Sequence, residues 1–173
     1  QVDATTIIQE SSGLAAAYSA VFMQYHNRAF ALKSQNLSIK RIADLKDRSV
    51  VAFQSADRYL GDEFGRMTKQ NSRYKELAQQ DAQTQLLFLG RTDVVVMDES
   101  IFHFYRAKLL NDGKIKDAEY VAFDVFPPTP YKAAFNDAKL RDDFDRNIAA
   151  MRKDGRYDAV YRKYAERYFT VRK

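Results

Sequence analysis

The sequence predicts an α/β protein with mainly parallel sheets, and three observations point to this class. Two β-branched apolar runs, Ser49–Phe53 and Asp93–Met97, have the composition of strands buried on both faces of a sheet. A segment with apolar residues at helical spacing follows each run, and residues 139–152 repeat that spacing in a clear stripe. Strands that alternate with helices in this way are typical of layered α/β folds.

The N-terminal part is expected to contain short elements. Apolar and aromatic side chains dominate its extended segments, whereas small and polar residues fill the connections between them. In order, the elements are a buried strand over 2–8, a turn or short helix over 9–17, an extended segment within 20–32, a polar connector over 34–38 and a short helix over 39–45.

A helix is expected directly after the first buried run. It places Leu60, Phe64 and Met67 on one face, because they are spaced four and three residues apart. Ser55 or Asp57 is suited to be its N-cap, since short polar side chains accept hydrogen bonds from the first free N–H groups of a helix.

The second half of the chain is expected to hold most of the remaining helices. Gly90 is placed to end a helix that begins at residue 81 or 84, because glycine readily adopts the left-handed backbone of a C′ residue. Pro127, Pro128 and Pro130 are expected to break the extended segment 120–126. The other elements are a polar stretch at 72–79, a strand at 93–97, a helix at 100–110, a turn at 111–113, a helix at 139–152 ended by residues 154–155, and a final helix at 157–168.

Composition excludes several classes of function. The 173 residues suffice for one domain or two small lobes, and no apolar run approaches the roughly 20 residues that cross a bilayer. Without cysteine the chain has no disulfide and no thiolate nucleophile, and its two histidines lack the spacing of a metal site. Asp98 and Glu99 are sequence neighbours at the end of a strand and are expected to point apart, which makes them poor acid–base partners. We therefore expect no catalytic residue, no metal and no cofactor.

The net charge of +5 comes from the C-terminal end, where 12 Lys and Arg face 7 Asp and Glu over residues 131–173. A basic end can bind nucleic acid or a membrane surface. Here the basic residues alternate with acids along helices, which is typical of a solvated face. No compact three-helix DNA reader is visible, so we expect no nucleic-acid partner.

Five segments spread over the chain carry recognisable motifs: QVDATTII, AYSAVFMQY, IKRIADLKDRSVVAFQSA, LLFLGRTDVVVMDE and LRDDFDRNIAAMRKDGRYDAVYRKY. In this order they resemble the bacterial solute-binding proteins of ABC importers, in the group (family 3) that includes polar amino-acid binders. The fourth, for example, is similar to the family pattern L-x-x-G-R-x-D-A-V-x-x-D.

The resemblance implies a type II periplasmic-binding-protein fold of two α/β lobes. Residues 1–31 and 132–173 would form the first lobe, residues 36–126 the second, and residues 32–35 and 127–131 the hinge crossovers between them. Family members normally carry further N-terminal residues, so the first lobe is expected to be incomplete, with about the N-terminal third of the family fold absent. A fragment, a shortened chain or a segment-exchanged dimer would each account for this.

The resemblance also implies a function. Such a protein is periplasmic or extracytoplasmic, binds a small polar solute (an amino acid or a related amine) in the cleft between its lobes, and passes it to the membrane permease of an ABC importer. The present chain shows no signal peptide at its start. The alternative is the ligand-sensing extracytoplasmic domain of a membrane signalling protein, which uses the same fold.

A zwitterion would suit the carboxyl ends of the two buried strands, where open α/β sheets bind ligands. Free N–H groups at a helix start around Ser55, Ala56 and Asp57 favour an anion, and Arg58 could add a bidentate contact. The charge of Asp98 suits an ammonium group, and the resemblance assigns it the ligand's amine.

Structural roles compete with these assignments. Asp98 could instead be the N-cap of the helix 100–110, and Ser55 and Asp57 could be simple caps. The resemblance places Tyr18 and Ser19 near the cleft, but Tyr18 could equally be a buried tyrosine that is hydrogen-bonded to the backbone. Where relatives carry T-x-x-R, with an arginine that clamps the ligand carboxylate, this chain has residues 9–17 without arginine. Glu10 in that segment indicates a cationic ligand or a solvated loop acid. The candidate ligand-binding residues are Asp98, Arg58, Asp57, Ala56, Ser55, Tyr18, Ser19 and Glu10.

Overall fold

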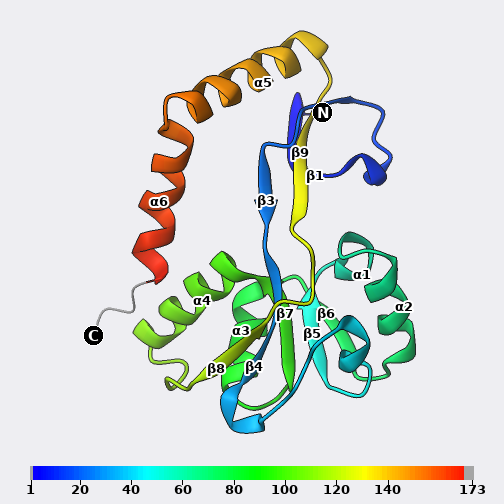
Figure 1. Ribbon diagram of the computed structural model, residues 1–173, viewed down its shortest axis with the longest axis vertical. Helices are drawn as coiled ribbons and strands as arrows, with labels where there is room; N and C mark the ends of the chain where they lie inside the picture. The colour runs from blue at the N-terminus through cyan, green and yellow to red at the C-terminus, as the bar shows by residue number, and fades with distance from the viewer. Residues whose placement is uncertain (1, 170–173) are drawn as a thin grey trace. The chain divides into compact units, whose positions relative to one another are not determined.

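The computed structural model describes the backbone of residues 2–169 and the side chains up to residue 164 (Figure 1). The chain forms two compact units, a smaller one of Gln1–Tyr25 with Pro128–Arg167 and a larger one built from His26–Pro127. The hinge role expected for 32–35 and 127–131 stays a prediction. The outermost parts of the predicted first lobe, residues 1 and 170–173, lie outside the described residues.

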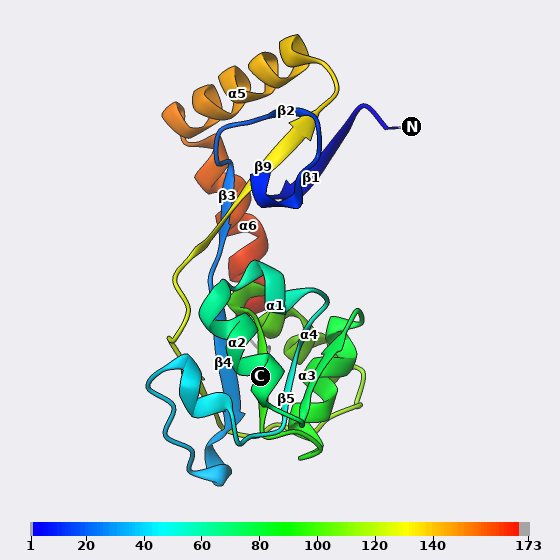
Figure 2. The ribbon, with the colours of Figure 1, turned by 90° about the vertical axis from the view of Figure 1, so that its right-hand side faces the viewer.

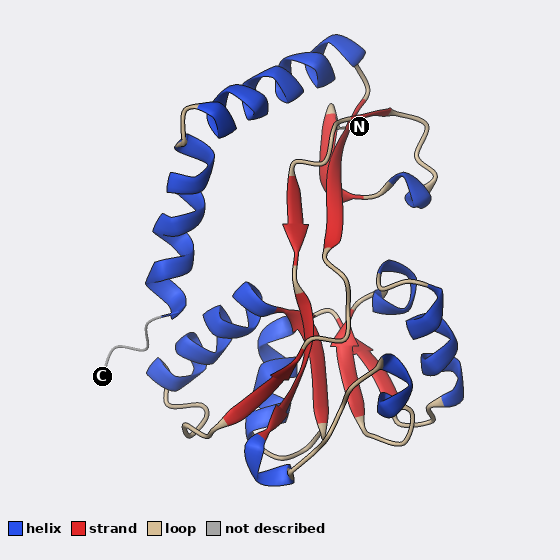
Figure 3. Ribbon diagram, in the orientation of Figure 1, coloured by secondary structure: helices blue, strands red, loops and turns tan. Residues whose placement is uncertain are grey.

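The larger unit contains a five-stranded mixed sheet, coloured red in Figure 3. Its order is β6 (Tyr74–Leu77), β5 (Val50–Phe53), β7 (Val94–Asp98), β4 (Asn27–Leu32) and β8 (Tyr120–Phe123). The α/β class is confirmed, with parallel pairing confined to β5 with β6 and β5 with β7. Strand β4 runs antiparallel to both β7 and β8, so this half of the sheet departs from the expected parallel arrangement.

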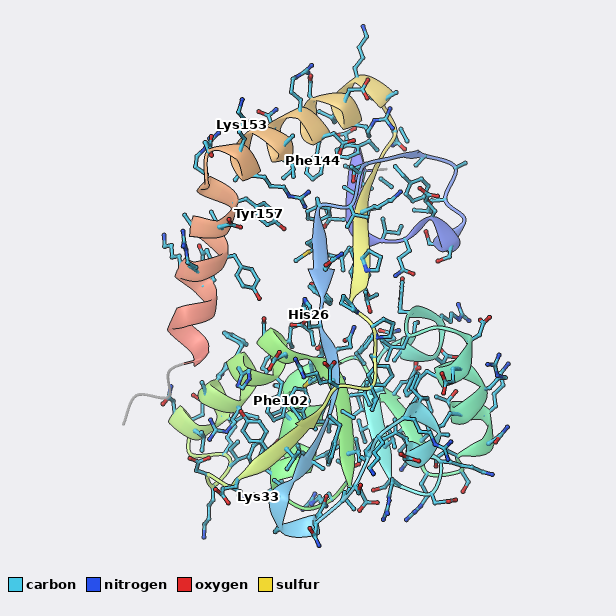
Figure 4. All side chains as sticks on the ribbon, in the orientation of Figure 1. His26, Lys33, Phe102, Phe144, Lys153 and Tyr157 are labelled. Atoms are coloured by element: carbon cyan, nitrogen blue, oxygen red, sulfur yellow. The ribbon has the colours of Figure 1, made fainter. Side chains whose placement is uncertain are left out.

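Both faces of this sheet are buried, as the apolar runs predict. Val94 and Val96 point into one core with Phe64 and Met67, while Val95 and Met97 point into the other with Phe102. Neighbouring residues of a strand face opposite sides, so a strand packed on both sides must be apolar throughout. Phe102 stacks on Phe30 with ring centroids 3.8 Å apart, and Figure 4 labels it within this unit.

The helices of the larger unit match the predicted positions except after β5. There the chain forms two helices in place of one, because Gly61, with φ of 87°, interrupts the run between them. Phe64 and Met67 still pack into the core as expected. The helices are α1 (Ala56–Tyr59), α2 (Asp62–Gln70), α3 (Gln80–Phe88) and α4 (Glu99–Asn111), with 3-10 turns η2 (Lys33–Gln35) and η3 (Ile42–Leu45).

The polar stretch 72–79 contains a strand, β6, that the sequence did not reveal. Lysine and glutamate are depleted in strands, so Tyr74–Leu77 carries little strand signal of its own. The segment is extended because it pairs with β5 from Val50–Tyr74 to Phe53–Leu77.

The smaller unit is organised around β9 (Thr129–Phe135), which pairs antiparallel with β1 (Ala4–Ile8), β2 (Ala17–Tyr18) and β3 (Met23–Tyr25). The extended segment 120–126 ends as strand β8 at Phe123, before the prolines that were expected to break it, whereas Pro130 itself lies inside β9. Strand β1 was expected to be buried, but most of its residues are exposed or half-buried. The 3-10 turn η1 (Glu10–Ser12) follows β1.

Two C-terminal helices, α5 (Ala138–Lys153) and α6 (Arg156–Phe169), complete this unit (Figure 2). Asp137 caps α5 by accepting hydrogen bonds from the N–H groups of Lys139 and Leu140. Phe144, labelled in Figure 4, packs α5 onto the unit through its ring contacts with Phe22 and Phe135. No helix in the described part of the chain has the length and apolar character to cross a membrane.

Candidate functional site

The sheet of the larger unit brings the predicted strand ends to a common edge. Strands β5, β6 and β7 are parallel, so their carboxyl ends lie together. Strand β4 begins at the same edge, because Asn27 pairs with Asp98. His26 marks this end of β4 in Figure 4, and Lys33 marks the other.

Asp98 ends β7 and caps α4. One of its carboxylate oxygens accepts hydrogen bonds from the N–H groups of Ser100 (2.9 Å) and Ile101 (3.1 Å). The other accepts from the N–H of His26 at 2.9 Å. Asp98 is 6% exposed, and burial raises its pKa despite these hydrogen bonds. The capping alternative is therefore present in the structure, while contact with a ligand amine stays a prediction.

Glu99 interacts with side chains, whereas Asp98 accepts hydrogen bonds from backbone N–H groups. Its carboxylate pairs with Arg28 on β4, with Nε to Oε2 at 3.0 Å. A second Arg28 nitrogen lies 3.8 Å from the carboxylate of Asp124, and the His103 ring lies 3.9 Å from Glu99. Burial lowers the pKa of His103 more than the charge of Glu99 raises it. Asp98 and Glu99 thus belong to separate interactions, as their sequence positions indicate.

The turn from β5 into α1 holds the predicted anion donors, and two of them, the N–H groups of Ser55 and Asp57, already have an acceptor. Ser55 has a left-handed backbone (φ of 62°), and its side chain makes no capping hydrogen bond. Instead the carboxylate of Glu76, from β6, accepts from the N–H of Ser55 at 2.7 Å and of Asp57 at 3.2 Å. The hydroxyl of Tyr74 also donates to Glu76, at 2.7 Å.

The Glu76 carboxylate is charged at neutral pH. Burial acts to raise its pKa, but the hydrogen bonds from Tyr74 and from the N–H groups of Asp57 and Ser55 outweigh burial, and the pKa lies below the ordinary value. Burial, followed by the hydrogen bond and negative charge of Glu76, raises the pKa of Tyr74 far above its ordinary value. Tyr74 is therefore a neutral donor to an ionised acceptor.

Sequence reasoning missed Glu76 and Tyr74 because their strand was not recognised. A period-two reading of 74–77 would have placed both side chains on the same face of a strand. It would not have revealed which helix start Glu76 reaches, since that depends on the pairing of β6 with β5.

The other larger-unit candidates differ in accessibility. Ala56 is fully buried, Asp57 is half-buried and Arg58 is exposed. Gly65 of α2 packs closely against this turn, and a Cβ added to it would lie 2.8 Å from the carbonyl oxygen of Asp57. The backbone at α1 is therefore held on one side by α2 and on another by Glu76.

The remaining candidates belong to the smaller unit, and all three have structural partners. Ser19 is 2% exposed; its hydroxyl accepts from the N–H of Ala133 (2.9 Å) and donates to its neighbour's carbonyl. The hydroxyl of Tyr18 donates to the carbonyl of Leu14 at 3.1 Å. Glu10 is exposed and pairs with Lys132. A ligand role for these residues stays a prediction.

A pocket of about 460 Å³ lies elsewhere, next to Lys33 and Tyr120 where β4 ends and β8 begins. Its charged side chains pair with one another, Lys33 with Glu119 and Arg106 with Asp117. It lies at the sheet edge opposite the carboxyl ends of β5, β6 and β7.

Comparison with known proteins identifies the fold. The sequence matches no protein-family model and no curated protein. Among solved structures, the chain is similar to an ancestral arginine-binding protein bound to glutamine, with 23% identity and a TM-score of 0.69 over 94% of this chain and 71% of that one. An amino-acid ABC transporter substrate-binding protein, AbpA of Streptococcus pneumoniae, bound to L-arginine, gives 17% identity and a TM-score of 0.71 over 97% and 70%.

A solute receptor for L-cysteine of Neisseria gonorrhoeae gives 22% identity and a TM-score of 0.66 over 97% of this chain and 66% of that one. At these identities the comparisons define the fold, which is the two-lobed α/β fold of periplasmic binding proteins. The chain thus matches solved structures over nearly its whole length while spanning about two thirds to seven tenths of theirs.

Proposed function

We propose that the chain is the solute-binding component of an ABC-type importer and binds a small polar solute, an amino acid or a related amine. The observation that supports this most is the fold likeness over 94–98% of the chain to proteins described as amino-acid binders. The same likeness supports an extracytoplasmic location and a membrane permease as the partner. Assembly as a segment-exchanged dimer is a separate expectation, which light scattering of the purified protein tests.

We place the solute at the carboxyl-end edge of the larger sheet. This edge carries charged groups of both signs, among them the exposed Arg58, the half-buried Asp57 and the capping carboxylate Asp98. Ligands of open α/β sheets bind at this kind of edge because loops and helix starts converge there.

A binding role without catalysis fits the chemistry of this edge. Asp98 and Glu99 have separate partners and cannot share a proton across a substrate. One similar structure is an ancestral amino-acid-binding protein described as a precursor of cyclohexadienyl dehydratase, so a turnover assay belongs beside the binding assay.

A thermal-shift screen of amino acids, polyamines and small carboxylates against the purified full-length protein tests the proposal. A solute added at one hundred times its Kd stabilises the folded state by about 2.7 kcal/mol, which is an easily measured shift. We expect at least one amino acid or amine to give such a shift. No shift with any member of the panel would contradict solute binding.

A further inference from the structure

We infer that Glu76 determines which solutes this edge accepts. It occupies the N–H groups of Ser55 and Asp57 at the start of α1, so the bound solute is an amine or guanidine whose carboxylate, where present, is not received by these two groups. This inference rests on the proposed function and narrows its substrate class.

Three donors converge on the carboxylate of Glu76. The N–H groups of Ser55 and Asp57 and the hydroxyl of Tyr74 lie 2.7, 3.2 and 2.7 Å from its oxygens. A free carboxylate could accept from the same three donors, because each is an N–H or O–H group directed at one carboxylate. The protein's own side chain takes the place of that ligand group.

A ligand carboxylate could reach these donors only by displacing Glu76. Displacement breaks hydrogen bonds to a charged acceptor, which are among the stronger ones in proteins. It also leaves the negative Glu76 near the incoming anion, and like charges at such distances repel each other. An amine meets no such competition, because the carboxylates of this edge attract it.

The cation on β4 does not offer an alternative receptor for a carboxylate. Arg28 is engaged by Glu99 at 3.0 Å and faces Asp124 at 3.8 Å. Arg58 is exposed on α1 and could contact a ligand carboxylate through its side chain. Substitution of Arg58 distinguishes this contact from one between the ligand carboxylate and the backbone N–H groups of the turn.

Arginine and agmatine form a matched pair of probes, since agmatine is arginine without its carboxylate. Titration calorimetry on the full-length protein should show agmatine binding at least as tightly as arginine. In E76A the N–H groups are free, and arginine should gain about tenfold relative to agmatine, the change that corresponds to one hydrogen bond with a charged group. E76Q keeps the side-chain volume, and its affinity for arginine relative to agmatine should lie between those of the wild type and E76A.

E119A serves as the matched control, because it removes the same charge at the opposite edge of the sheet, where Glu119 pairs with Lys33. It should leave the ratio of the two affinities unchanged. R58A reports separately on the exposed arginine. A loss of arginine binding in R58A, with agmatine binding unchanged, would assign the ligand carboxylate to that side chain and overturn the inference.

Hydrogen exchange of the unliganded wild type tests the contact itself without a variant. The amides of Ser55 and Asp57 should be protected, and rapid exchange at both would overturn the inference. Tighter binding of arginine than agmatine to the wild type, with no relative gain in E76A, would also overturn it while leaving solute binding intact. If no solute binds at all, the proposed function fails and the inference fails with it.

Discussion

Replacement of Asp98 by alanine is the most informative single change in the larger unit, because it removes three hydrogen bonds at one point. Two of them, to the N–H groups of Ser100 and Ile101, form the N-cap of α4. An N-cap of this kind contributes about 1–2 kcal/mol. The third, to the N–H of His26, ties the start of β4 to the end of β7.

A hydrogen bond to a charged group contributes about 1.5–3 kcal/mol, and here the unpaired N–H left behind adds to the loss. Part of the total is offset, because the wild type must keep a carboxylate buried at 6% exposure. We therefore expect D98A to lower the free energy of unfolding by about 2–4 kcal/mol.

Urea unfolding followed by circular dichroism measures this difference. D98N is the matched variant: asparagine is an equally good N-cap, so D98N should lose less than D98A. D137A removes the exposed cap of α5 and should cost about 1 kcal/mol or less. A D98A protein as stable as D137A would refute the capping argument and leave ligand contact as the reason for the acid.

Two further changes test the turn at α1. G65A should destabilise the protein by about 1–3 kcal/mol, because its Cβ would lie 2.8 Å from the carbonyl oxygen of Asp57. K69A, on the exposed side of the same helix, should be neutral in the same unfolding assay. Equal effects of the two substitutions would refute the close contact. The lowered pKa of Glu76 contributes stability that is present above its ordinary value of 4.5 and is lost as pH falls through the folded-state pKa. E76Q should therefore lose less stability than wild type on acidification below about pH 4.5, and parallel pH profiles of the two proteins would contradict this assignment.

Local patterns were sufficient for most helices and for the buried strands. The run 94–97 is apolar throughout because both faces of β7 are covered, and that requirement is visible in the residues themselves. Gly90 ends α3 with φ of 66°, as its position predicts. Gly61 was the missed signal, since a glycine within a helical pattern can mark a break as well as a tolerated position.

The strands β6 and β9 show where local patterns fail. Residues 74–77 are polar and 129–135 contain a proline, so neither segment predicts a strand strongly. Both become strands because neighbouring strands supply hydrogen-bond partners, β5 for β6 and β1, β2 and β3 for β9. Those partners lie far away in the sequence.

The sequence by itself determined the α/β class, the order of the helices, the buried strands β5 and β7, and the acid at the end of β7, because each depends on residues within a few positions of one another. Only the tertiary structure decided that Glu76 occupies the N–H groups of Ser55 and Asp57, and that Asp98 reaches the N–H of His26. These contacts span 19 to 72 residues of chain and exist because strand pairing brings distant segments to one sheet edge. A side chain's partner across a sheet depends on strand order and register, which local composition does not encode.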